Sequence, residues 1–425
     1  MGLPSTRRAL VALLVAGSVP FVCAACNMIL GVEDVKPRRT RDGSSNEEDD
    51  VENNDPLPDP DATTSRPNVF QTALGEAHTC ARKPDGTVKC WGAADLGQAG
   101  TTEADGGVIL VPREVEGVDD AVDIAAGRNH TCIARRDGTI SCWGFNPAGQ
   151  LGNGEAGNVR ASPVDVVGIR GIAVAAGGDF SCAIRTQGTV ACWGGNDYGQ
   201  LGKGDTVGST TPVAVADLED VVAISAGQKH ACAVKSDGTV FCWGDGENGQ
   251  LGYGKVGGKT KPVAVESLPP ATMVAAGQRS TCALTSAGSV YCWGANEVGQ
   301  LGTGAANATP NPSPIVVSKL EEVKSIWMGA DHACALREDG SVVCWGAGGR
   351  GQLGDGRTRP DGGAQPSFVV VSGVQNAVNV GAGWYHSCAP TRTNAVLCWG
   401  ANDRGQLGNG SVISELSPVA VSGYP

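Results

Sequence analysis

The chain has 425 residues, more than one ordinary hydrophobic core can serve, so several domains or one large repetitive domain are expected. Its 63 glycines and 5% aromatic residues are typical of a turn-rich β protein, and 18% charged residues are too few for a disordered polyelectrolyte. The net charge of −12 gives no electrostatic footprint for nucleic acid and disfavours such binding, so we predict no nucleic-acid partner.

The N-terminus resembles the export signal of a bacterial lipoprotein. Arg7 and Arg8 precede the apolar run ALVALLVAGSVPFV, which is short for a membrane span. Because the run ends in CAAC, we interpret residues 1–26 as a lipoprotein-type signal peptide with a lipid on Cys26. The lipoprotein pattern usually has Leu where this chain has Cys23, so a plain secretory signal or an uncleaved anchor stays open.

Residues 27–68 are predicted to form an acidic, disordered tether. Between Glu33 and Asn68 there are eleven acidic and five basic side chains and almost no apolar ones. Such a segment cannot bury enough apolar surface to offset the loss of chain entropy on folding. We expect it to hold the folded part away from a membrane.

Residues 69–425 contain seven copies of one unit. The first cysteine of each copy recurs every 50 to 54 residues, a period typical of propeller blades and solenoids. The unit at 221–268 holds four short β-rich runs separated by Gly, Asp and Pro, which predicts a four-stranded blade without helices. The units are expected to begin near residues 69, 121, 171, 221, 271, 323 and 377.

The shared pattern AGxxHxCA…DGTVxCWGxNxxGQLGxG…PVxV resembles the regulator of chromosome condensation repeat. The resemblance covers the seven copies and implies an all-β protein, a seven-bladed β-propeller with four-stranded blades. Members of that family exchange nucleotide on a small GTPase, scaffold ubiquitin ligases or, as secreted bacterial proteins, inhibit β-lactamase. The resemblance therefore indicates the fold and leaves the function open.

Each copy has two cysteines ten residues apart, and we predict one disulfide per blade. If Cys232 pairs with Cys242 across antiparallel strands, residues 236–238 form a three-residue loop whose last position favours left-handed geometry. That position is Gly in six copies and Asn394 in the seventh, and Asn tolerates this geometry next best. Export would provide an oxidising compartment, although reduced core cysteines and metal or redox roles stay open. The predicted pairs are Cys80–Cys90, Cys132–Cys142, Cys182–Cys192, Cys232–Cys242, Cys282–Cys292, Cys334–Cys344 and Cys388–Cys398.

Tryptophan follows the second cysteine of every copy, and this sevenfold recurrence predicts packing between adjacent blades. All five histidines occupy one slot, two residues before a first cysteine, which Phe180 and Ser280 fill in the other copies. Because the slot accepts Phe and Ser, structural hydrogen bonding is favoured over metal binding or catalysis. The histidines are His78, His130, His230, His332 and His386.

No catalytic motif departs from the repeat. The sequence has no H-E-x-x-H, G-x-S-x-G or Walker pattern, so we predict no catalytic residues, no cofactor and no metal site. The copies differ in length by at most four residues, which leaves no obvious room for a long insertion that could promote nucleotide exchange on a GTPase. An enzyme and an exchange factor are the least favoured functions.

The two residues before each histidine slot differ from copy to copy, and we interpret them as a binding surface. Function in propellers usually lies in loops at one face, and Trp, Tyr and Arg are enriched at binding hot spots. For Trp384 and Tyr385, packing where the last blade meets the first is an equal alternative. The candidate partner-binding residues are Arg128, Asn129, Asp179, Lys229, Arg279, Asp331, Trp384 and Tyr385.

We therefore predict a monomeric propeller that binds a protein partner at the cell envelope, as an enzyme inhibitor or a scaffold. Its membrane contact is expected through the lipid anchor alone, at the outer membrane or cell surface; without the anchor it would be secreted or periplasmic. Binding of carbohydrate or peptidoglycan is the alternative.

Overall fold

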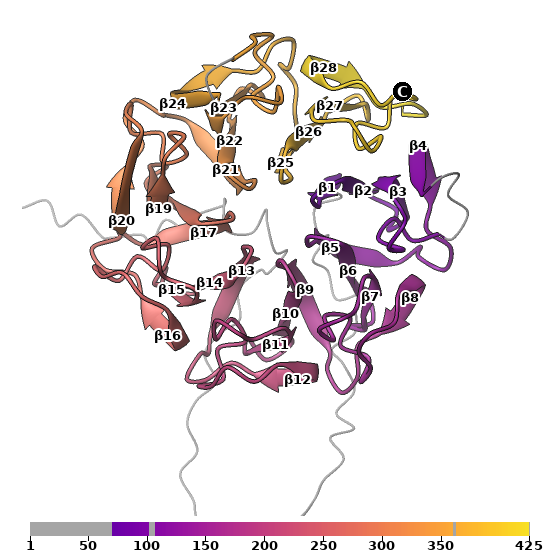
Figure 1. The fold of residues 1–425 in the computed structure, drawn as a ribbon, viewed down its shortest axis with the longest axis vertical. Coiled ribbons are helices and arrows are strands. Elements are labelled where there is room, and N and C mark those ends of the chain that lie inside the picture. Colours follow the sequence, from indigo (N-terminus) through magenta and orange to yellow (C-terminus); the bar gives the residue numbers. More distant parts are fainter. Residues whose placement is uncertain (1–69, 102–106, 360–362, 425) are drawn as a thin grey trace, which may run out of the picture.

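A computed structural model describes residues 70–101, 107–359 and 363–424. These residues form 28 strands in seven four-stranded antiparallel sheets, arranged as blades around a central channel (Figure 1). The prediction of an all-β, seven-bladed propeller is confirmed. The predicted signal peptide, Cys26, the tether and Val69 lie outside the described residues.

Within each blade the four strands follow chain order from the channel to the rim, and blades 1 to 7 are numbered along the chain (Figure 1). The inner strands are β1 (Gln71–Leu74), β5 (Ala121–Ala126), β9 (Gly171–Ala176), β13 (Val221–Ala226), β17 (Ala271–Ala276), β21 (Val323–Met328) and β25 (Gly381–Ala382). The second strands are β2 (His78–Arg82), β6 (His130–Arg135), β10 (Phe180–Arg185), β14 (His230–Lys235), β18 (Ser280–Thr285), β22 (His332–Arg337) and β26 (His386–Pro390).

The two outer strands of each blade complete the sheets. The third strands are β3 (Val88–Ala93), β7 (Ile140–Gly144), β11 (Val190–Gly194), β15 (Val240–Gly244), β19 (Val290–Asn296), β23 (Val342–Ala347) and β27 (Val396–Gly400). The rim strands are β4 (Val108–Glu114), β8 (Arg160–Asp165), β12 (Ser209–Ala214), β16 (Lys259–Ala264), β20 (Asn307–Val316), β24 (Ala364–Val370) and β28 (Glu415–Ala420).

The second and third strands of each blade form the predicted cysteine hairpin. In blade 4, Cys232 lies opposite Cys242, and the Gly238 N–H donates to the Lys235 carbonyl at 2.9 Å with Gly238 at φ +84°. Asn394 adopts the same left-handed geometry at φ +64°. All seven predicted disulfides are present, with Cα–Cα distances of 4.0–4.1 Å and cysteines at most 1% exposed.

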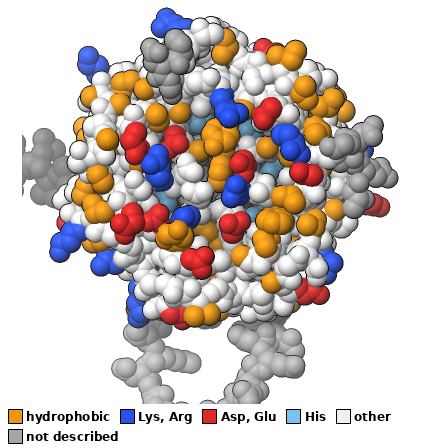
Figure 2. Space-filling view, viewed as in Figure 1, with side chains coloured by type: hydrophobic (Ala, Val, Ile, Leu, Met, Phe, Trp, Pro, Cys, Tyr) orange, Lys and Arg blue, Asp and Glu red, His pale blue; other side chains and the backbone are white. Residues whose placement is uncertain are grey.

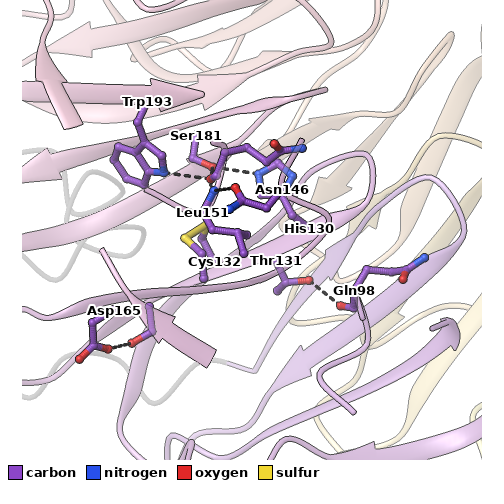
Figure 3. Close-up of a disulfide and its surroundings, with 12 residues drawn as sticks. Gln98, His130, Thr131, Cys132, Asn146, Leu151, Asp165, Ser181 and Trp193 are labelled. Atoms are coloured by element: carbon purple, nitrogen blue, oxygen red, sulfur yellow. Dashed lines mark hydrogen bonds between the residues drawn. A yellow bond between two sulfur atoms is a disulfide. The ribbon is translucent and has the colours of Figure 1, made fainter. Parts of the chain in front are cut away.

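The tryptophan that follows the second cysteine of each blade is fully buried against the preceding blade, as predicted. Figure 3 shows the junction of blades 2 and 3, where Trp193 Nε1 donates to the carbonyl of Gln150 at 2.9 Å. Gly152, at φ +68°, lets the GQLG loop approach, because a Cβ there would lie 2.7 Å from Trp193 Nε1. The same bond closes the ring, from Trp91 of blade 1 to Gln406 of blade 7.

The histidine slot also makes hydrogen bonds between blades. His130 Nε2 lies 2.8 Å from Ser181 Oγ, and that hydroxyl donates to the Gln150 carbonyl at 2.8 Å (Figure 3). Because the hydroxyl proton is already used, Nε2 is the donor toward Ser181. The bonded pairs, at 2.7–3.0 Å, are His78–Thr131, His130–Ser181, His230–Thr281, His332–Ser387 and His386–Thr79.

The residue that faces the histidine slot from the next blade changes together with the residue in the slot. Where Phe180 replaces histidine, the next blade has Ala231 at the hydroxyl position, and where Ser280 replaces it, the next blade has Ala333. A buried hydroxyl is thus present at this position only where a histidine bonds to it. The histidines are a structural device, as the sequence predicted.

The ring closes without exchange of a strand. Blade 1 consists of β1 to β4 and blade 7 of β25 to β28. Besides the Trp91 and His386 bonds, the Trp384 N–H donates to the Gly75 carbonyl at 3.1 Å, and the Tyr424 ring packs edge-on against Phe70 at 5.6 Å. Side-chain packing and loop hydrogen bonds therefore hold the last blade to the first.

Candidate binding surface

The loops between the first and second strands of all blades surround one mouth of the channel, and we call this end the loop face. Neighbouring loops bond to one another: Glu76 N–H donates to the Arg128 carbonyl at 3.1 Å, and Arg128 N–H to that of Gly177 at 3.0 Å. The structure thus brings the predicted residues together on one face. Their pairs are Glu76–Ala77, Arg128–Asn129, Gly178–Asp179, Gln228–Lys229, Gln278–Arg279, Ala330–Asp331 and Trp384–Tyr385.

The mouth itself is narrow. A cavity of ≈ 80 Å³ is bordered mainly by glycines and alanines, together with Leu74, Met328, Gln228, Gln278 and Trp384. A larger cavity of ≈ 240 Å³ lies along the inner strands, where alanine predominates. Besides small residues, the lining of the mouth therefore includes two glutamines, one tryptophan and two larger apolar residues.

A second set of loops, between the third and rim strands, reaches the same face, and the sequence analysis missed its residues. Lys229 Nζ lies 2.7 Å from the Tyr198 hydroxyl and 4.0 Å from the centre of that ring. Arg404 forms an ion pair with Asp95 at 3.0 Å. A signal was present, because the residue before GQLG (GQAG in blade 1) varies as freely as the predicted pairs. It is Leu96, Ala148, Tyr198, Asn248, Val298, Arg350 or Arg404.

Charged side chains of both signs alternate around the centre of the face in Figure 2, with the pale-blue histidines between them. Arg128 Nε pairs with Glu76 at 2.8 Å, and Arg279 pairs with Glu297 at 3.0 Å and with Asp331 at 3.5 Å. Burial raises the pKa of Asp331, although Arg279 opposes the shift. Half-exposed ion pairs contribute at most about 1 kcal/mol each, so they mainly fix side-chain positions.

Four residues form a continuous row across blades 2, 7 and 6, which we call the aromatic–arginine row: Arg128, Trp384, Tyr385 and Arg350. The Arg128 guanidinium lies 5.3 Å from the Trp384 ring centre, and the Trp384 and Tyr385 rings meet edge-on at 6.4 Å. Arg350 lies 4.8 Å from the Tyr385 ring centre. Trp384 thus closes the ring through its backbone while its side chain borders the mouth.

The remaining predicted residues belong to the same surface. Asp179 is half-buried, and burial raises the pKa of its carboxyl while Arg128 opposes the shift. The Asn129 carbonyl accepts the Phe145 N–H at 2.9 Å, which ties the two loops of blade 2 together. The surface therefore offers hydrogen-bond donors, charges and aromatic rings.

Chemistry at the histidines is limited by burial. The five side chains are 0% exposed, and burial lowers the pKa of His130 and His230 to about 4 and that of His78, His332 and His386 to about 3. The described residues contain no cluster of three His, Cys, Asp or Glu side chains suited to a metal ion. The same part of the chain has no helix long and apolar enough to cross a membrane.

The fold and the repeated blade junctions define a propeller built from one recurring unit. The family model of the RCC1-like domain matches residues 36–272, and that of the regulator of chromosome condensation (RCC1) repeat matches residues 287–336, 339–389 and 394–425. The first match alone spans more than half of the chain. The chain belongs to the RCC1-like family.

Curated relatives are similar over short stretches. The human probable E3 ubiquitin-protein ligase HERC6 is 33% identical over 111 residues, 26% of this chain and 11% of HERC6. The ultraviolet-B receptor UVR8 of Arabidopsis thaliana is 34% identical over 96 residues, 23% of this chain and 21% of UVR8. These matches span only about a tenth to a fifth of each relative's length.

Solved structures share the architecture at low identity. Human WBSCR16 is 21% identical with a TM-score of 0.70, covering 79% of this chain and 94% of its own. Prp20p of Saccharomyces cerevisiae, described with its binding properties to Gsp1p and histones, is 21% identical with a TM-score of 0.69, covering 83% and 87%. At this identity the likeness shows the fold alone.

Proposed function

We propose that this propeller is a protein-binding module that engages its partner with the loop face. The proposal rests on the place where the blades differ in sequence: no two blades present the same pair of residues on this face. Trp, Tyr and Arg, the types enriched at binding hot spots, lie together beside the channel mouth. The binding of Gsp1p and histones named for Prp20p supports a binding role for the fold.

The proposal extends to location and mode of action. The protein is exported, carries a lipid on Cys26 and acts at the outer membrane or cell surface as an inhibitor or scaffold, without catalysis. The lipoprotein-like signal supports this, and seven buried disulfides suit an oxidising compartment. Carbohydrate binding is less well supported, because guanidinium groups already lie over one face of the Trp384 and Tyr385 rings.

Capture from envelope extracts tests the proposal. We expect Trp384→Ala to lower recovery of the partner at least about tenfold and Arg279→Ala to lower it several-fold, as hot-spot truncations do. Arg136→Ala is the matched control, because Arg136 is exposed on the hairpin loop at the opposite end of blade 2. If both loop-face variants retain every interaction, the proposed face is wrong.

A further inference from the structure

One arginine of the loop face keeps its donors free. Among the described residues, no ion pair or hydrogen bond involves the Arg350 guanidinium, which is exposed and lies 4.8 Å from the centre of the Tyr385 ring. Stacking on an aromatic ring restricts the side chain before any ligand arrives. Arg350 is therefore a preoriented cation without a counter-charge among the residues that the structure describes.

The other basic groups of this face are already paired. Arg128 has Glu76, Arg279 has Glu297 and Asp331, and Arg404 has Asp95. Lys229 is bonded to the Tyr198 hydroxyl. The free charge is thus specific to blade 6.

The loop that carries Arg350 also departs from the repeat. In five blades an exposed acid stands three residues before the glutamine of GQLG, whereas blade 6 has Gly349 at this position and Arg350 directly after it. Blade 6, like blade 2 with Pro147, therefore lacks the acid that the other five blades have at this position. The five acids are Asp95, Asp197, Glu247, Glu297 and Asp403.

We infer that Arg350, held on Tyr385, anchors a carboxylate of a polypeptide partner whose adjoining residues lie along Trp384. The inference rests on the proposed function and names the chemistry that the loop face recognises. A planar guanidinium bonds a carboxylate through two parallel N–H donors, which fixes orientation as well as charge. Gln228 and Gln278 at the mouth provide amides that match peptide N–H and C=O groups.

The carboxylate could belong to an Asp or Glu side chain or to a chain terminus, and one peptide array distinguishes these sources. The probes are synthetic 12-residue peptides in matched triplets: acidic with an amidated terminus, Asn/Gln-substituted with an amidated terminus, and Asn/Gln-substituted with a free terminus. The full-length protein is applied, and affinities of bound peptides are measured by fluorescence anisotropy. We expect binding by one of the two carboxylate-bearing forms and none by the fully neutral form.

Variants of the row give the second arm. Arg350→Gln is expected to weaken the carboxylate peptide at least about tenfold, as loss of a bidentate charge pair does. Tyr385→Leu, which removes the platform and keeps the charge, is expected to weaken it several-fold. Arg357→Gln is the matched control, because Arg357 belongs to the same loop region of blade 6, is 77% exposed and lies outside the row.

The results separate this inference from the proposed function. Equal affinity for the neutral form, unchanged affinity of Arg350→Gln, or no bound peptide would each overturn the carboxylate anchor. Binding of a glycan array that depends on Trp384 and not on Arg350 would also overturn it. Partner capture that is lost in Trp384→Ala and intact in Arg350→Gln would overturn the anchor and leave the protein-binding function standing.

Discussion

In the interior of the ring every junction between blades repeats one tryptophan-to-carbonyl contact, whereas on the loop face no two blades present the same pair. The interior repeats a buried tryptophan bonded to a carbonyl of the preceding blade and a disulfide inside each hairpin. On the loop face, residue types change and charges differ. A contact made seven times serves the ring, so a specific ligand must be recognised where the blades differ.

Departures from the repeat are of two kinds, and the difference between them is informative. Arg82 stands where the other blades have Ala, Ile, Val, Leu or Pro, and it is only 7% exposed. Its Nε donates to Gln71 at 2.7 Å, and Gln71 in turn donates to Asp123 at 3.1 Å. Arg82 is thus compensated inside the ring, while Arg350 on the loop face is not.

The largest loss of stability is expected from removing the tryptophan side chain at an interior junction between two blades. Trp243 is fully buried and bonded to the Gln200 carbonyl at 2.8 Å, so Trp243→Ala should lower the free energy of unfolding by about 3–5 kcal/mol. Tyr198→Ala, which removes a 41% exposed aromatic residue from the loop face, should cost less than about 1 kcal/mol. Guanidinium denaturation checks both, and equal losses would contradict the division between interior and face.

Removal of one disulfide should have the next largest effect. The bond between Cys232 and Cys242 closes a loop with a sequence separation of 10, so the double Cys→Ala variant should lose about 2–3 kcal/mol on the chain-entropy account. The same denaturation measurement applies. Partner capture should be unchanged at a temperature where the variant is folded, and loss of capture there would place binding in the repeated scaffold.

The paired histidine and hydroxyl offer a sharper test within the interior. Thr281→Ala leaves the His230 Nε2 donor buried without its acceptor, which should cost about 1–3 kcal/mol. His230→Phe with Thr281→Ala copies the Phe180–Ala231 pair of another junction and should recover part of that loss. A double variant no more stable than Thr281→Ala alone would contradict the compensation.

The smallest effect is a pH dependence. Burial lowers the pKa of His230 from 6.5 to about 4, so the unfolded chain binds a proton that the folded chain does not between these values. The contribution of His230 to the free energy of unfolding is therefore complete above pH 6.5 and falls as the pH drops toward 4. The double variant without His230 should lose about 1 kcal/mol less than the parent between pH 7.5 and 5.5. Denaturation midpoints at both pH values measure this difference, and identical losses would refute it.

Much of the blade could be predicted from the sequence because its determinants are local. The Cys232–Cys242 register depends on a three-residue loop, and Gly238 or Asn394 at the left-handed position reports it directly. For the contacts between blades, the sequence predicted that tryptophan packs there but did not predict its partner atoms. The bond from Trp193 to the Gln150 carbonyl joins residues 43 apart, and backbone acceptors leave no trace in residue identity.

Only the part of the candidate site that has a local sequence signal was predicted. The loops that carry Arg128 and Trp384 precede a marked histidine slot, so their variation was easy to see. Tyr198 and Arg350 were missed because only the assembled sheet shows that the loops before GQLG reach the same face. The partner of each histidine was readable in principle, since a hydroxyl occurs one repeat later only when the slot holds histidine.

Crosslinking from both ends of the propeller tests most directly whether function lies on the loop face. The photoreactive residue p-benzoylphenylalanine is placed at Asn129 on the loop face or at Ser236 on the exposed hairpin loop at the opposite end, in full-length protein made by its own host. Our account predicts a discrete adduct from Asn129, weakened by Trp384→Ala, and none from Ser236. An adduct from Ser236 alone would contradict it.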